Sequence, residues 1–247
     1  MKHRILILIL FTGVISGIGK AQNNTLSAKE KKAGWKLLFE GKTNQGWHRI
    51  HQDKFPDRGW VITNGELCCV ASDKGESTNG GDIATIEEFD NFELAWEWKM
   101  LTKGGNSGLK YFVKDTASNG NDKYALGLEY QLLDDENFEW MKTGQMKPGD
   151  YRTLGSLYEI YPAVVKHPKP LGEYNISRIV SKGSHVEHWL NGEKILEYER
   201  GSADFRKKVA ESKFKVYKGF GEAPKGKIVL QDHGCNICFR NIKIKKL

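Results

Sequence analysis

The sequence predicts an all-β fold, an antiparallel sandwich formed by residues 22–247 as a single domain. Many short alternating or apolar runs are separated by Gly, Asn and Asp, and only one long segment has the character of a helix. In the run Phe92–Met100 every second residue is apolar, as expected of a strand with one buried face. Asn191-Gly192 is a strong hairpin signal between two further runs.

Twelve segments show strand character, and they continue almost to the C-terminus. The expected strands are Trp35–Leu38, Trp60–Thr63, Glu66–Val70, Ile83–Thr85, Phe92–Met100, Gly108–Val113, Leu126–Leu133, Tyr174–Ser181, His185–Leu190, Glu193–Glu199, Gly226–Gln231 and Ile237–Lys245.

One short helix is expected near residues 202–217. Ser202 is a suitable N-cap and Asp204 in the first turn complements the helix dipole, while Gly219 marks the end. Residues 27–33 have some helix propensity and are expected to form at most a single turn.

The first 21 residues have the pattern of a cleavable signal peptide. A basic start precedes the apolar run Ile5–Ile18, and Gly19-Lys20-Ala21 supplies the small residues of a cleavage site. The apolar run is short for a membrane span, and no Cys stands at the cut to carry a lipid. The expected location is therefore periplasmic or secreted, without a membrane span.

Charge and cysteine content exclude some functions and leave others open. The net charge of +7 falls to +4 when the signal peptide's three basic residues are removed, and basic residues do not cluster with aromatics, so nucleic acid is not an expected partner.

The pairs Cys68-Cys69 and Cys235-x-x-Cys238 allow one bridge between them, while buried free thiols are the default and zinc is the weaker alternative.

The most informative stretch is Asn106–Asp134, which reads as two strands joined by a long loop. In the second strand Gly127, Glu129 and Gln131 share one face, because strand side chains alternate. The opposite face carries Leu128, Tyr130 and Leu132 and suits a core. A carboxylate and an amide beside a glycine indicate a candidate site, with Asp134 just past the strand end.

Several ordered motifs resemble one known family over essentially the whole mature chain. They are Trp35–Lys42 with Gly46-Trp47, Trp60 with Gly65-Glu66-Leu67, Asp90–Met100, Gly105–Gly108, Glu129-x-Gln131-x-x-Asp134, Gly155–Tyr158, Glu173–Asn175, Trp189–Gly192, Leu230–Gly234 and Phe239–Ile242. Together they resemble the 3-keto-disaccharide hydrolase family. The resemblance implies a concanavalin A-like jelly-roll sandwich of two curved antiparallel sheets that binds sugar on a concave face. It also implies cleavage of glycosides whose sugar carries a ketone at carbon 3.

Such a site needs a general base, an electrophile and an acid, because the ketone makes the carbon 2 proton acidic and an enolate can expel the group on carbon 1. The candidate catalytic residues are Glu129, His233 and Asp134. Glu129 could instead pair with Lys110 or Arg240, Asp134 could cap a turn, and His233 could be a surface turn histidine. Glu129 or Asp134 could also hold a divalent cation with loop carbonyls.

The expected partner is a carbohydrate, and further side chains are candidates for binding it. They are Gln131, Asn106, Lys110, Tyr158, Gln231, His188 and Trp140. For His188 a packing or sheet-surface role is the stronger interpretation unless the side chain faces the cleft. The function predicted first is an exported enzyme that cleaves keto-glycosides by hydrolysis or elimination, and the alternative is a lectin-like carbohydrate-binding module that uses the same face without catalysis.

Overall fold

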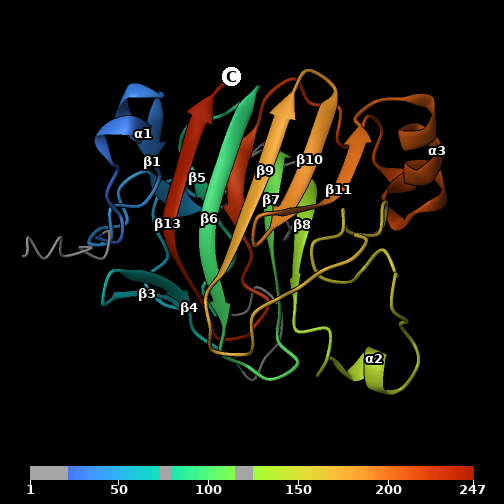
Figure 1. Ribbon diagram of the computed structural model, residues 1–247, viewed down its shortest axis with the longest axis horizontal. Coiled ribbons are helices and arrows are strands. Elements are labelled where there is room, and N and C mark those ends of the chain that lie inside the picture. The colour runs from blue at the N-terminus through green and yellow to red at the C-terminus, as the bar shows by residue number, and fades with distance from the viewer. Residues whose placement is uncertain (1–21, 73–78, 115–124) are drawn as a thin grey trace, which may run out of the picture.

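The computed structural model describes residues 22–72, 79–114 and 125–247. The predicted signal peptide and most of the long loop after Val113 lie outside these residues. Within them, two antiparallel sheets pack face to face, with one sheet in front of the other in Figure 1. This arrangement confirms the predicted all-β jelly-roll sandwich. No helix in the described part of the chain has the length and apolar character needed to cross a membrane.

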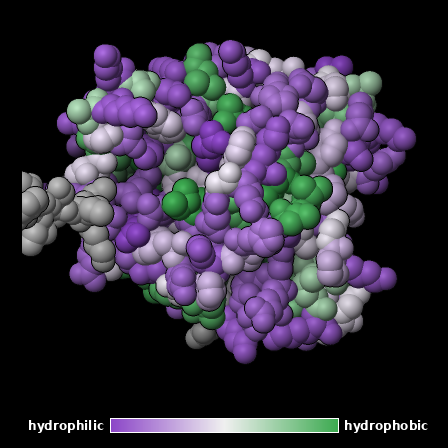
Figure 2. Space-filling view, in the orientation of Figure 1, coloured by the Kyte–Doolittle hydropathy of each residue, from purple (hydrophilic) through white to green (hydrophobic). Residues whose placement is uncertain are grey.

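The larger sheet contains eight strands, and its central members are the longest. Its order is β11 (Glu193–Glu199), β10 (His185–Leu190), β9 (Asn175–Lys182), β6 (Phe92–Met100), β13 (Ile237–Lys246), β4 (Glu66–Cys69) and β3 (Trp60–Thr63), with β1 (Trp35–Leu37) also paired to β13. The alternation predicted for β6 is confirmed, since every second residue is buried. The outward face of this sheet is mostly hydrophilic in Figure 2.

The smaller sheet contains five strands and lies behind the larger one in Figure 1. Its order is β2 (Trp47–Arg49), β5 (Ile83–Thr85), β12 (Lys227–Leu230), β7 (Asn106–Val113) and β8 (Leu128–Leu133). The three-residue strand β2 was not predicted, because Trp47-His48-Arg49 is too short and polar to show a period.

The core between the sheets is aromatic. Trp96 of the large sheet meets Tyr130 of the small sheet edge to face, with ring centroids 5.1 Å apart. A bulge changes the alternation near the end of β7, where Phe112 has a φ of 54° and the register with β12 shifts. As a result Tyr111 and Phe112 both pack against Phe92 in the core.

Among the described residues, three short α-helices and one 3-10 helix accompany the sheets: α1 (Ala28–Lys32), α2 (Glu139–Lys142), α3 (Ala203–Glu211) and η1 (Lys213–Val216). The helix expected near 202–217 is therefore two pieces. Ser202 caps α3 as predicted, but Ser212 has extended backbone, and its hydroxyl accepts from the Phe214 amide to start η1. The turn α2 was not predicted.

The cysteines divide into one bridge and two thiols. Cys68 and Cys238 stand opposite each other on β4 and β13 and form a disulfide, whereas Cys69 and Cys235 are free. The bridge between the two pairs is thus present. The default expectation of free thiols was therefore wrong for Cys68 and Cys238. These residues are 170 positions apart, and only the pairing of β4 with β13 brings them together.

Candidate active site

Strands β7 and β8 of the small sheet and the segment after β12 present polar side chains on the face that turns away from the core. In the register of β7 and β8, Lys110 is opposite Glu129 and Gly108 is opposite Gln131. On its other edge β7 pairs with β12, and the backbone N–H of Gln231 donates to the Gly108 carbonyl at 3.0 Å. The predicted alternation in β8 is confirmed, because Leu128, Tyr130 and Leu132 all belong to the core.

These side chains form the floor of a pocket of about 420 Å³, a size that suits a small-molecule ligand. The residues that line it are Asn106, Lys110, Ala125, Leu126, Gly127, Glu129, Gln131, Tyr158, Lys213, Phe214, Val216, Tyr217, Gln231 and His233. We call Asn106, Lys110, Glu129, Gln131, Gln231 and His233 the polar floor. Polar groups buried at such density in one hollow are the arrangement expected of a site that orients a polar ligand.

Glu129 lies over Gly108, which has no side chain to displace it. A Cβ built on Gly108 would overlap the Glu129 carboxylate oxygen Oε1 and stand 2.9 Å from Cδ. The glycine therefore makes the space in which the carboxylate rests. Glu129 is 8% exposed, and it is the one carboxylate among the described residues that line the pocket.

A hydrogen-bond chain links β8 to the segment after β12. Nε2 of Gln131 donates to Oδ1 of Asn106 at 3.1 Å, and Nδ2 of Asn106 lies 3.0 Å from Nε2 of His233. Because Oδ1 of Asn106 accepts from Gln131, the side-chain NH2 group of Asn106 is the part that faces the His233 ring. The amide of Asn106 therefore orients the His233 ring through Nε2.

Two aspartates that the sequence did not single out hold this floor in place. Oδ2 of Asp82 accepts from Nζ of Lys110 at 3.0 Å, and both side chains are almost fully buried. Oδ1 of Asp82 accepts from the Asp232 amide, and the Asp232 carboxylate accepts from the amides of Gly80, Gly81 and Gly234. Asp232 therefore fixes the loop that presents His233. Asp82 lies in none of the motifs noted in the sequence, and Asp232 lies in the motif Leu230–Gly234 without a signal for this supporting role.

Each residue considered as a partner for Glu129 forms an ion pair with another carboxylate, and Lys110 also stands opposite Glu129 in the strand register. Lys110 forms the ion pair with Asp82, and Arg240 donates to Glu97 at 2.7 Å on the large sheet.

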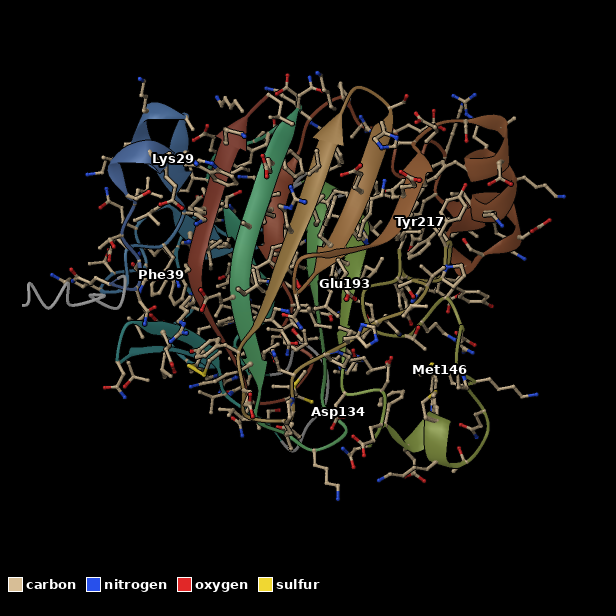
Figure 3. The ribbon with its side chains drawn as sticks, viewed as in Figure 1. Lys29, Phe39, Asp134, Met146, Glu193 and Tyr217 are labelled. Carbon is tan, nitrogen blue, oxygen red and sulfur yellow. A yellow bond between two sulfur atoms is a disulfide. The ribbon has the colours of Figure 1, made fainter. Side chains whose placement is uncertain are left out.

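Asp134 lies outside the pocket, so we do not retain it as a catalytic candidate. Its carboxylate accepts from the Gly104 amide at 2.8 Å and from Nδ2 of Asn137, which is the turn-capping alternative. Figure 3 shows Asp134 at the lower end of the molecule, away from the pocket residue Tyr217 beside α3. The strand ends before Asp134, so the alternation that aims Glu129 and Gln131 at the pocket does not reach it.

Two of the predicted carbohydrate-binding residues also lie elsewhere. His188 is fully buried between Tyr111, whose hydroxyl is 2.7 Å from Nε2, and the Gly155 carbonyl, 2.8 Å from Nδ1. Burial lowers the pKa of His188 to about 4, so the ring is a neutral core residue. Trp140 lies on α2 with its ring near Phe138 and Arg152 and does not line the pocket.

The other predicted residues meet in the pocket: Glu129, His233, Gln131, Asn106, Lys110, Tyr158 and Gln231. The sequence did not predict the contribution of η1, because that segment was assigned to a longer helix. Its alternation of Lys and apolar residues from Lys213 to Tyr217 is the signal that could have indicated a separate element.

Groups that could bind a metal do not coincide with the pocket. In the described part of the chain, the sets with suitable geometry are His185, Glu187 and Glu197, and Glu66 with the disulfide sulfurs of Cys68 and Cys238. Neither contains Glu129 or Asp134. A disulfide sulfur is not a thiolate ligand, so the second set does not suit a metal.

Fold and pocket together define a class: a jelly-roll protein whose smaller sheet carries a pocket with a polar floor. Residues 34–245 match the family model described as a 3-keto-alpha-glucoside-1,2-lyase-like domain. The chain belongs to this family. The resemblance noted in its sequence motifs is thereby confirmed.

The chain is similar to characterised and solved relatives over most of its length. It is 35% identical to the 3-keto-disaccharide hydrolase of Bacteroides thetaiotaomicron, over 92% of this chain and 83% of the relative. The crystal structure of a candidate glycosyl hydrolase from Parabacteroides distasonis has a TM-score of 0.80 at 34% identity, covering 92% of this chain and 100% of that one. A second such structure from the same species has a TM-score of 0.60 at 31% identity, covering 86% and 99%.

Proposed function

We propose that the protein cleaves glycosides whose sugar has been oxidised to a ketone at carbon 3. The observation that carries this proposal is the meeting of Glu129 and His233 in one pocket with the amides of the polar floor. The relative named as a 3-keto-disaccharide hydrolase supports the substrate class. A site that only binds sugar needs aromatic rings and amides, whereas a carboxylate held over a glycine beside an imidazole suits proton transfer.

The proposed first step is removal of the carbon 2 proton by Glu129. The electron pair of the C2–H bond forms a C2=C3 double bond, and the ketone oxygen becomes an enolate oxygen. Lys110, across the strand pair from Glu129, supplies positive charge for that oxygen, and Asp82 holds its ammonium in place.

In the second step the C3 carbonyl re-forms and the C1–O bond breaks, leaving a C1=C2 double bond. His233, entering the step as the imidazolium ion, is the proposed source of the proton that the leaving oxygen takes up, and it ends the step as the neutral ring. If the unsaturated ketone is released at this point, the protein is a lyase. If water adds to carbon 1 and a proton to carbon 2, the net reaction is hydrolysis. Neither outcome needs the paired carboxylates of an ordinary glycosidase.

The test is NMR of the purified protein with a 3-keto-disaccharide in D2O, beside the same sugar without protein and beside the unoxidised disaccharide. We expect cleavage of the keto-sugar alone, with deuterium at carbon 2 of the hydrolysed product or a C1=C2 vinyl signal. Equal cleavage of the unoxidised disaccharide would refute the elimination scheme. Sugar binding without turnover by wild type would favour the carbohydrate-binding module.

We also propose export directed by residues 1–21. The disulfide between Cys68 and Cys238 supports an oxidising compartment, where such bridges form and persist. Mass spectrometry of the protein recovered from its native cells tests this proposal. A mature chain beginning near Gln22 is expected, and an intact Met1 terminus would contradict it.

A further inference from the structure

The pocket has two sides of different character. The polar floor comes from β7, β8 and the segment after β12. The opposite side, which we call the η1 wall, consists of Leu126, Tyr158, Lys213, Phe214, Val216 and Tyr217. Apart from the Lys213 ammonium and two tyrosine hydroxyls, this wall presents hydrocarbon and aromatic surface.

The η1 wall is a firmly held element. Phe214 is buried and stacks on Phe220, with ring centroids 4.0 Å apart and planes within 8°. Ser212 caps the start of η1, and the Tyr217 amide donates to the Phe214 carbonyl at its end. Because the element is anchored through Phe214, its exposed residues keep a constant position over the pocket.

Val216 and Tyr217 are exposed beyond what core packing requires. Val216 is 72% exposed and Tyr217 is 39% exposed, although both line the pocket. Exposed apolar side chains that gather at the rim of a polar pocket mark a surface that a ligand covers. The ammonium of Lys213 lies 4.3 Å from the centre of the Tyr158 ring. The alkyl chain of Lys213 therefore adds to the apolar surface of the same wall.

We propose that the η1 wall is the subsite for the leaving group and that it selects a leaving group with an apolar ring over a second sugar. This inference rests on the proposed function, which places the sugar that reacts on the polar floor. A second sugar would bring several hydroxyls to a wall that offers few hydrogen-bond partners. An apolar ring instead removes Val216 and Tyr217 from water.

The test compares benzyl 3-keto-glucosides of both anomeric configurations with a 3-keto-disaccharide. The variant Val216→Ser/Tyr217→Ser removes the exposed apolar surface, and Val165→Ser is the matched control, since Val165 is also 72% exposed but does not line the pocket. We expect wild type to favour the benzyl substrate. The double variant should lose about tenfold or more in kcat/KM on that substrate and little on the disaccharide. Equal losses on both substrates, or none, would overturn the inference.

A binding measurement separates this inference from the proposed reaction. Calorimetry with unoxidised benzyl and methyl glucosides needs no turnover. Tighter binding of the benzyl glucoside, lost in the double variant and kept in Val165→Ser, supports the subsite even if no keto-sugar is cleaved. Equal affinity of wild type for the two glucosides overturns the subsite even if the keto-disaccharide is cleaved.

Discussion

The outward faces of the two sheets use the same alternation of strand side chains for different purposes. On the large sheet, carboxylates meet cations on neighbouring strands, Glu93 with Arg178 and Lys245 and Glu97 with Arg240, and Glu66 reaches Lys99 across the intervening strand β13. On the small sheet, one carboxylate shares a pocket with amides, an imidazole and the Lys110 ammonium that Asp82 holds. An outward polar residue is thus a candidate for chemistry only where its neighbours form a hollow.

Electrostatics on the large sheet illustrate the structural use of charge. Burial acts to raise the pKa of Glu93, but hydrogen bonds from Lys245 and Arg178 outweigh it and lower the pKa below its usual range. A carboxylate held ionised by two cations is a poor proton acceptor. The ion pairs on this face therefore stabilise the sheet and keep its surface hydrophilic. We expect catalysis not to depend on them.

The difference between the two outward faces is tested most strongly by replacing one glutamate on each face with glutamine. Glu129→Gln keeps the shape of the side chain and removes the proposed base, so kcat should fall about 10³-fold. Glu93→Gln should leave kcat unchanged and cost roughly 1 kcal/mol of stability, since ion pairs on the outward face of a sheet contribute little. The keto-sugar assay and urea unfolding of both variants provide the measurements. Equal activity of the two variants would refute the assignment of Glu129.

A smaller loss is expected from Gly108→Ala. The added Cβ would meet the Glu129 carboxylate and force it to move, and misplacing a catalytic group by about 1 Å can cost about 10²-fold. Activity should fall while circular dichroism and the unfolding midpoint change little. Full activity would show that Glu129 does not act from the position over Gly108.

The buried His188 is expected to make the free energy of unfolding depend on pH. His188 has a pKa of about 4 in the folded protein and about 6.5 when unfolded, so the unfolded chain binds the proton more tightly. The free energy of unfolding should therefore fall by about 2 kcal/mol between pH 7 and pH 5. Hydrogen bonding to Glu199 raises the pKa of the exposed His185, which acts weakly in the opposite direction.

Urea unfolding at both pH values measures this effect. His188→Gln removes the titrating ring and should flatten the dependence, although it lowers stability at pH 7. An unchanged slope in that variant would assign the effect to another group.

The smallest expected effect concerns the hydrogen-bond chain of the polar floor. Asn106→Ala removes the group between Gln131 and His233 and should lower kcat/KM about tenfold through loss of orientation. Thr102→Ala is a suitable comparison, because its hydroxyl accepts from the Asn236 amide at an exposed loop and does not reach the pocket. Equal losses in the two variants would indicate a general effect on the nearby loops.

Much of the site could be predicted from alternation alone. In β8 a period of two places Glu129 and Gln131 on the face opposite Tyr130, and pairing with β7 then brings Lys110 beside them. Asp134 was misassigned because it follows the last residue of the strand, where turn geometry decides the direction of a side chain. For His188 the packing interpretation was right and the binding role was not retained, because alternation states which residues share a face but not which face is buried.

The sequence by itself determined the sandwich, the alternating faces and the membership of Glu129, Gln131 and His233 in one motif set, because these depend on local periodicity and residue order. Only the tertiary structure decided that Asp82 and Asp232 support the floor, that Cys68 bridges to Cys238, and that η1 walls the pocket. These features join residues far apart in the chain. Their contacts arise from sheet packing and strand register, which no local pattern encodes.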